Sequence, residues 1–231
     1  MNVAVRGGDD AVAAAVGVSG ASLVPEDGER AVDAVVAVGD DAIRSTVADS
    51  PDAPVLPVTA DGGRHLVARD TLDGALATLV AGDGTRWSHP VVGVHRDGSV
   101  VARAVKDVAL VTAAPASISE YALRAGATRL GSVRADGIVV ATPMGSDGYA
   151  AAAGGPVLEA GAGLSVVPVA PFSTSPDVRV VDPEAGLGLS VEREGEVALF
   201  VDGIRYGSAD VGTDVRIERA GVLDVVTPDT G

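Results

Sequence analysis

The sequence predicts an α/β domain followed by a β-rich domain. In roughly the first ninety residues, short apolar runs alternate with segments of helical spacing, which is typical of βαβ units. From Val91 onward, short runs rich in Val and Ile recur with Gly, Asp and Pro between them, as in all-β folds. We therefore place an α/β domain at 1–92 and a β-rich domain at 93–217, and we expect the last segment, about 218–231, to return to the first domain.

Apolar patterning predicts the elements of the first domain. The run 34–38 is continuously apolar, as expected of a parallel strand that is buried on both faces. The leucine spacing in 71–81 predicts a helix. Residues 7–10, Gly-Gly-Asp-Asp, are predicted to form a turn and the cap of the alanine-rich helix that follows. Further short strands are predicted at 3–5, 22–24 and 55–58.

The second domain is predicted to consist mostly of strands, with one helical interruption after Ser146. Its predicted strands are 91–94, 100–105, 108–112, 138–141, 166–169, 178–181, 197–201 and 215–217.

The composition excludes several kinds of function. Thirty-two acidic and 17 basic residues give a net charge of −15, so a protein that binds the nucleic-acid backbone is not expected. Without cysteine there is no disulfide and no thiolate zinc site, and the three histidines have no metal-ligand spacing. Lys106 is the only lysine. Such an acidic, lysine-poor chain is typical of a salt-adapted protein, although an ordinary acidic protein remains an alternative.

Apolar runs also fall short of a membrane span. None approaches the ~20 residues that a spanning helix needs, and the N-terminal residues lack the basic region of a signal peptide. We expect a cytoplasmic protein with no membrane partner.

The stretch 136–156 is the most informative for chemistry. It is predicted to be a strand that ends at Thr142-Pro143, a turn through Gly145, and a short alanine helix. We expect Ser146 and Asp147 at the start of this helix, where unpaired backbone N–H groups can bind an anion. The alternative is a plain strand, turn and helix in which Asp147 only caps.

This stretch resembles the signature of the NAD kinases. The matching residues are Asp136-Gly137, Thr142-Pro143, Gly145-Ser146, Tyr149 and Ala153-Gly154-Gly155-Pro156. The resemblance extends weakly over almost the whole chain. Val38-Gly39-Asp40-Asp41 stands where the family has a GGDG motif after a buried strand, and Val201-Asp202-Gly203 resembles a later landmark.

The resemblance implies a two-domain fold, with an α/β nucleotide-binding domain and a C-terminal β-sandwich domain. It implies phosphoryl transfer from ATP or polyphosphate to the adenosine 2′-hydroxyl of NAD, with Mg²⁺ accompanying ATP and with assembly into a homodimer or homotetramer. Asp40 is the expected general base. The expected nucleotide-binding residues are Gly39, Asp41, Arg44, Lys106, Asp107, Arg134, Asp136, Gly145, Ser146, Asp147, Gly148, Tyr149, Ala152 and Ala170.

The sequence also departs from the family pattern. Val38 and Asp41 replace glycines, and a carboxylate beside a polyphosphate is repulsive unless a cation intervenes. Lys106-Asp107 replaces an Asn-acidic pair. Three functions therefore stay open: an active NAD kinase, a catalytically impaired paralogue that binds a nucleotide as sensor or subunit, and a related kinase with another hydroxyl acceptor.

Overall fold

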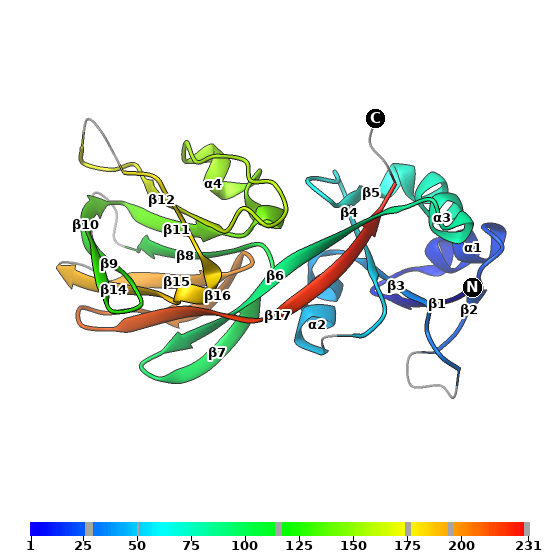
Figure 1. The fold of residues 1–231 in the computed structure, drawn as a ribbon, viewed down its shortest axis with the longest axis horizontal. Helices are drawn as coiled ribbons and strands as arrows, with labels where there is room; N and C mark the ends of the chain where they lie inside the picture. The colour runs from blue at the N-terminus through cyan, green and yellow to red at the C-terminus, as the bar shows by residue number, and fades with distance from the viewer. Residues whose placement is uncertain (26–29, 50, 114–116, 174–176, 194–195, 229–231) are drawn as a thin grey trace. The chain divides into compact units, whose positions relative to one another are not determined.

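The computed structural model describes residues 1–25, 30–49, 51–113, 117–173, 177–193 and 196–228 (Figure 1). The chain forms two compact units, of which unit 1 comprises Met1–His89 and the segment that begins at Val222, and unit 2 comprises Pro90–Gly221. Two long strands, β6 (Thr85–Arg96) and β17 (Asp214–Thr227), pass through the boundaries between these units. The divisions expected from sequence, near residues 92 and 217, lie inside these two strands.

Unit 1 alternates strands and helices. Besides its parts of β6 and β17, it contains β1 (Asn2–Arg6), α1 (Asp10–Val18), β2 (Ser22–Leu23), β3 (Ala34–Val38), α2 (Asp40–Asp49), β4 (Val55–Thr59), β5 (Val67–Ala68), the 3₁₀ turn η1 (Arg69–Thr71) and α3 (Leu72–Ala81). Strands β2, β1, β3, β4 and β5 pair in that order, and every one of these pairs is parallel. The predicted strand at 34–38 and the predicted helix at 71–81 are confirmed as β3 and α3.

The core of unit 1 explains why β3 is so apolar. Successive residues of a strand point to opposite faces of the sheet. Ala34 and Val36 pack in one cluster with Val12 of α1 and Leu76 of α3. The intervening Val35 is also buried, and α2 packs against β3 and β1. A strand covered in this way has no polar face.

Unit 2 consists almost entirely of strands. Besides its parts of β6 and β17, it contains β7 (Ser99–Ala104), β8 (Asp107–Thr112), β9 (Ser119–Ala125), β10 (Thr128–Ala135), β11 (Gly137–Ala141), η2 (Pro143–Gly145), α4 (Tyr149–Ala152), β12 (Leu164–Val169), β13 (Arg179–Val181), η3 (Pro183–Ala185), β14 (Leu187–Arg193), β15 (Val197–Val201) and β16 (Ile204–Ser208). The predicted strands correspond to β6, β7, β8, β11, β12, β13, β15 and β17, whereas β9, β10, β14 and β16 are not predicted by the apolar runs.

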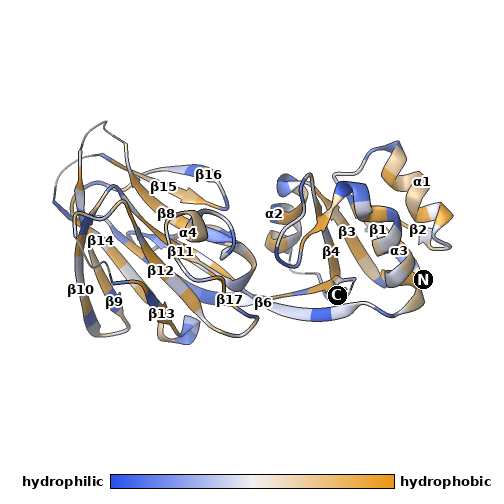
Figure 2. Cartoon of the chain, turned by 90° about the horizontal axis from the view of Figure 1, so that it is seen from above, coloured by the Kyte–Doolittle hydropathy of each residue, from blue (hydrophilic) through white to orange (hydrophobic). Residues whose placement is uncertain are grey.

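Two antiparallel sheets enclose the core of unit 2. One has the strand order β13-β12-β11-β8-β15-β16, and the other includes β10-β9-β14-β17. Leu110 and Ile138 of the first sheet share a buried cluster with Tyr121 and Leu189 of the second. Figure 2 shows the hydrophobic character of β12 in this unit and of β3 and β4 in unit 1. None of the helices in the described ranges has the length and apolar character needed to cross a membrane.

Candidate functional site

The loop between β3 and α2 lies at the carboxyl edge of the parallel sheet in unit 1. Strand β1 pairs with β2 on one side and with β3 on the other, so the order of strands reverses between β1 and β3. In open α/β sheets, ligands bind outside the carboxyl ends of the strands at such a point. Gly39 connects β3 to α2 there with φ 87°, a conformation that favours glycine.

Two carboxylates follow Gly39 in the first turn of α2. Asp40 and Asp41 are both exposed. The side chain of Asp41 is 97% exposed and forms an ion pair with Arg44, whose own side chain is only 19% exposed. The ion pair offsets part of the negative charge that Asp41 adds beside Gly39. Asp40 thus presents a carboxylate to solvent at the ligand-binding edge of the sheet.

The loop after β1 packs against the same junction. A Cβ atom on Gly7 would lie 2.4 Å from the carbonyl oxygen of Val38 and 2.7 Å from the Cβ atom of Ala42. Asp9 caps α1 by accepting a hydrogen bond of 3.0 Å from the backbone N–H of Val12. This bond, and then the contact with Arg69, hold the pKa of Asp9 below its usual value. The turn and helix cap predicted for 7–10 are confirmed.

In unit 2, the segment after β11 holds the backbone that precedes β8. The backbone N–H of Thr142 donates to the carbonyl of Lys106 at 2.9 Å, and the Thr142 hydroxyl donates to the carbonyl of Val105. Gly145 lies directly against the Lys106 backbone, where a Cβ atom would be 2.5 Å from the Lys106 carbonyl carbon. Lys106 is therefore fixed by residues nearly forty positions later in the chain.

Ser146 and Asp147 lie before α4 rather than in its first turn, contrary to expectation. Residues Pro143–Gly145 form a 3₁₀ turn that Ser146 closes, and α4 begins at Tyr149 after Gly148. The Ser146 hydroxyl is fully buried; it donates to the Pro143 carbonyl and accepts from the backbone N–H of Leu158, both at 2.9 Å. Ser146 thus contributes its side chain to the turn itself. A helix of four residues also provides little dipole for binding an anion.

Asp202 contacts the N–H groups of the segment 105–107, whereas Thr142 contacts its carbonyl groups. The Asp202 carboxylate accepts hydrogen bonds from the backbone N–H groups of Val105, Lys106 and Asp107, at 3.0, 2.8 and 3.0 Å. Burial raises the pKa of Asp202, and these three bonds counteract that rise. Asp202 is not among the expected site residues, because Val201-Asp202-Gly203 resembles the family only as a landmark with no assigned role.

Asp107 and Tyr149 have shifted acidities. Burial raises the pKa of Asp107 to about 6, the negative charge of Asp202 adds to the rise, and Lys106 opposes it. The pKa of the Tyr149 hydroxyl is raised by burial and then by the carboxylates of Asp107 and Asp136. Perturbed groups of this kind gather at functional sites. Tyr149 is about 40% exposed, and its hydroxyl interacts electrostatically with Asp107 and Asp136, which are both expected nucleotide-binding residues.

Arg134, Asp136 and Ala170 lie together near the start of β11. The backbone N–H of Asp136 donates to the Val169 carbonyl at 3.0 Å, and that of Phe172 donates to the Arg134 carbonyl at 2.8 Å. Ala170, between these two contacts, has φ 45°.

The expected residues of unit 2 therefore form two groups, one at each end of β11. Lys106, Asp107, Gly145 and Ser146 lie at the far end, and Asp147, Gly148 and Ala152 belong to the turn and short helix that carry Tyr149.

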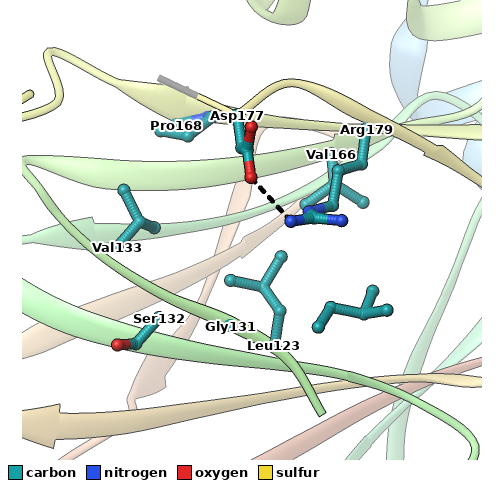
Figure 3. Close-up of a pocket in the computed structure, with 9 residues that line it drawn as sticks. Leu123, Gly131, Ser132, Val133, Val166, Pro168, Asp177 and Arg179 are labelled. Atoms are coloured by element: carbon teal, nitrogen blue, oxygen red, sulfur yellow. Dashed lines mark hydrogen bonds and ion pairs between the residues drawn. The ribbon is translucent and has the colours of Figure 1, made fainter. Parts of the chain in front are cut away.

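A pocket lies elsewhere in unit 2 and contains none of the expected residues. Its lining includes Leu123, Gly131, Val133, Val166 and the ion pair between Asp177 and Arg179, which are 2.6 Å apart (Figure 3). Because the sheet edges β10 and β13 supply much of this lining, the pocket reflects the open edge of the sandwich.

The ATP-NAD kinase C-terminal domain family matches residues 105–222 of the chain. The chain is 32% identical over 203 residues to the NAD kinase of Methanosarcina barkeri, a match that covers 83% of this chain and 72% of that protein. This chain belongs to the NAD kinase family. It is also 33% identical over 196 residues to the NAD kinase of Thermomicrobium roseum, covering 81% of this chain and 68% of that protein.

Solved structures confirm the NAD kinase fold. The NAD kinase from Archaeoglobus fulgidus in complex with ATP superposes with a TM-score of 0.74 and 23% identity, covering 99% of this chain and 94% of that one. Yeast NADH kinase complexed with NADH superposes with a TM-score of 0.77 and 16% identity, covering 98% and 83%. The predicted fold, α/β followed by a β-sandwich, is thus confirmed.

The NAD kinase family match includes only part of the predicted site. The predicted nucleotide contacts from Lys106 to Ala170, and also Asp202, lie inside the matched range 105–222. Asp40 with its neighbours Gly39, Asp41 and Arg44 lies outside that range. For these residues, support comes from their position at the carboxyl edge of the parallel sheet.

Proposed function

We propose that this chain is an NAD kinase that transfers a phosphoryl group from ATP or polyphosphate to the adenosine 2′-hydroxyl of NAD. Relatives of 32% and 33% identity are named NAD kinase. The observation that carries the proposal for this chain is the exposed carboxylate of Asp40, directly after Gly39 at the point where the strand order reverses.

Asp40 is the proposed general base. Phosphoryl transfer depends mainly on positioning and on neutralising phosphate charge, and a carboxylate orients the attacking hydroxyl and accepts its proton. The proton passes from the 2′-hydroxyl to a carboxylate oxygen as the new P–O bond forms and the bond to the donor's leaving phosphate breaks. Gly39 leaves room for phosphate beside the backbone, since apart from its two chain neighbours no described residue has an atom within 4 Å of the position of a Cβ there.

Mg²⁺ is proposed to enter with the donor nucleotide. The described residues contain no group of three or more His, Asp or Glu side chains arranged to hold a metal. The exposed carboxylates at the start of α2 are oxygen donors of the kind that Mg²⁺ prefers, but it usually binds through one or two of them together with substrate phosphates. The cation would reduce the repulsion between Asp41 and the phosphates.

The residues of unit 2 are proposed to bind NAD. Lys106 offers a positive charge to the dinucleotide phosphates in a chain of net charge −15. Arg134 offers a second positive charge. The exposed ring of Tyr149 offers a surface for the adenine or ribose.

The test is formation of NADP from NAD, Mg²⁺ and either ATP or polyphosphate, in molar KCl to screen the acidic surface. NADP formation with at least one donor supports the proposal. Calorimetric titration with NAD and NADP accompanies the assay. Binding without turnover would contradict kinase activity and favour a nucleotide-binding paralogue, whereas absence of both would favour another hydroxyl acceptor.

A further inference from the structure

Asp202 lies in the turn between β15 and β16, and the backbone conformation of this turn can form without an aspartate. Val201 pairs with Ile204, so Asp202 and Gly203 form a two-residue hairpin loop. Their φ angles are 45° and 78°, and two positive values are characteristic of a type I′ turn. Such turns accept Asn-Gly and Gly-Gly as readily as Asp-Gly. The hairpin alone therefore does not explain the Asp202 side chain.

The contacts of Asp202 are all directed at one segment. Its carboxylate accepts from the consecutive N–H groups of Val105, Lys106 and Asp107, and its own N–H donates to the Asp107 carbonyl at 2.9 Å. Asp202 is only 8% exposed. Burying a carboxylate is unfavourable unless hydrogen bonds replace its hydration. The fold thus places a buried charge where it holds three neighbouring backbone groups.

The same segment is held from its other side. The carbonyls of Val105 and Lys106 accept hydrogen bonds from Thr142, and Gly145 lies against the Lys106 backbone. The N–H groups and the carbonyls of this segment are therefore both occupied. The backbone of this segment is thus fixed from both sides, and Lys106 and Asp107 add the charged side chains that we expect to contact the ligand.

We propose that Asp202 is a positioning residue, which fixes the backbone of Val105–Asp107 so that Lys106 and Asp107 are held ready to bind the dinucleotide. The proposal rests on the proposed function, since it assumes that these two residues contact NAD. Asp202 itself does not touch the substrate. Its negative charge also attracts the Lys106 ammonium group, and this attraction counteracts part of the rise that burial causes in the pKa of Asp202.

Two substitutions remove the carboxylate and keep the turn. Asp202→Gly removes both carboxylate oxygens. Asp202→Asn keeps one side-chain oxygen, which can still accept from the backbone N–H groups of Lys106 and Asp107, but it places an amide N–H group opposite the N–H of Val105. We expect the affinity for NAD to fall about tenfold for Asp202→Gly and less for Asp202→Asn, as for other losses of hydrogen bonds to a charged group. The control Asp210→Gly changes an exposed aspartate of the same unit and should leave the affinity unchanged.

A double-mutant cycle separates positioning from a general loss of structure. In the Lys106→Ala/Asp107→Ala background, Asp202→Gly should reduce NAD affinity by less than twofold, because the side chains that it positions are gone. The same tenfold loss in both backgrounds would overturn the proposal.

Amide hydrogen exchange without nucleotide tests the positioning independently of the proposed function. Exchange at residues 105–107 should be at least tenfold faster in Asp202→Gly than in the wild type or Asp210→Gly. Unchanged exchange at these amides would overturn the proposal even if NAD kinase activity is found. If the wild type neither binds nor phosphorylates NAD, the proposed function fails, and so does the NAD-positioning role, even where exchange shows that Asp202 orders the segment.

Discussion

The carbonyl oxygen of Lys106 lies 2.3 Å from the position that a Cβ atom on Gly145 would occupy. No side chain fits there unless one of the two backbones moves. Gly145 therefore allows the segment after β11 to lie directly against the residue that we propose binds NAD.

Gly145→Ala should reduce both stability and NAD binding. The added methyl group must displace the Lys106 backbone, and overpacking of this kind typically lowers the free energy of unfolding by about 1–3 kcal/mol. Denaturant unfolding and calorimetry with NAD measure the two effects. The matched variant Gly221→Ala has no atom within 4 Å of its new Cβ and should change neither quantity appreciably. Equal behaviour of the two variants would contradict the close packing of Gly145 and Lys106.

Lys106→Ala should weaken NAD binding about tenfold at low salt, because it removes a positive charge proposed to face the dinucleotide phosphates. Lys106→Arg should retain most of the affinity. The difference between wild type and Lys106→Ala should shrink as KCl rises, since salt screens partly exposed charges. Arg205→Ala, which removes an exposed cation of the same unit, is the control. An affinity for NAD that does not change in Lys106→Ala would contradict a role of Lys106 in binding NAD.

Acidification should destabilise unit 1 through His89. This residue is fully buried, its Nε2 atom lies 2.8 Å from Nδ1 of His65, and the His65 ring stacks on Trp87 with centroids 4.1 Å apart. Burial lowers the pKa of His89 from 6.5 to about 4, and the charges of His65 and Arg64 contribute. Between these two values the unfolded chain binds a proton that the folded chain does not. The free energy of unfolding should therefore fall by about 3 kcal/mol as the pH drops from 6.5 to 4.

Trp87 reports this transition directly, because it is the only tryptophan in the chain. Its fluorescence should be followed through denaturant unfolding at several pH values. His89→Leu should remove most of the pH dependence, whereas His95→Gln, at a partly exposed histidine, should retain it. A pH dependence as steep in His89→Leu as in the wild type would rule out His89 as its source.

Local patterns predicted the parts of the fold whose sequence signal lies within a few neighbouring residues. The apolar run of β3, the Asp9 cap and the strand before Thr142 are each visible within a few neighbouring residues. Helix α2 is harder to recognise because Asp and Arg surround its buried residues, although Ala42, Ile43, Thr46 and Val47 have helical spacing. Strands β9 and β10 are equally hidden, since arginines interrupt them.

The contacts that organise the candidate site are not local, which is why sequence reasoning missed them. Asp202 bonds to residues 95 to 97 positions earlier in the chain. No short-range pattern encodes that pairing. Likewise, the burial of the Ser146 hydroxyl depends on Leu158, so Ser146 was expected at a helix start where the structure has a closed 3₁₀ turn.

The most direct test of the proposed function is the initial rate of NADP formation by wild type, Asp40→Asn and Asp10→Asn under identical conditions. Asp10, like Asp40, is an exposed aspartate in the first turn of a helix in unit 1. If Asp40 is the general base, Asp40→Asn should lower the rate at least about 100-fold, and Asp10→Asn should match the wild type. Equal rates in wild type and Asp40→Asn, or no NADP above background in any of the three, would contradict catalysis by Asp40.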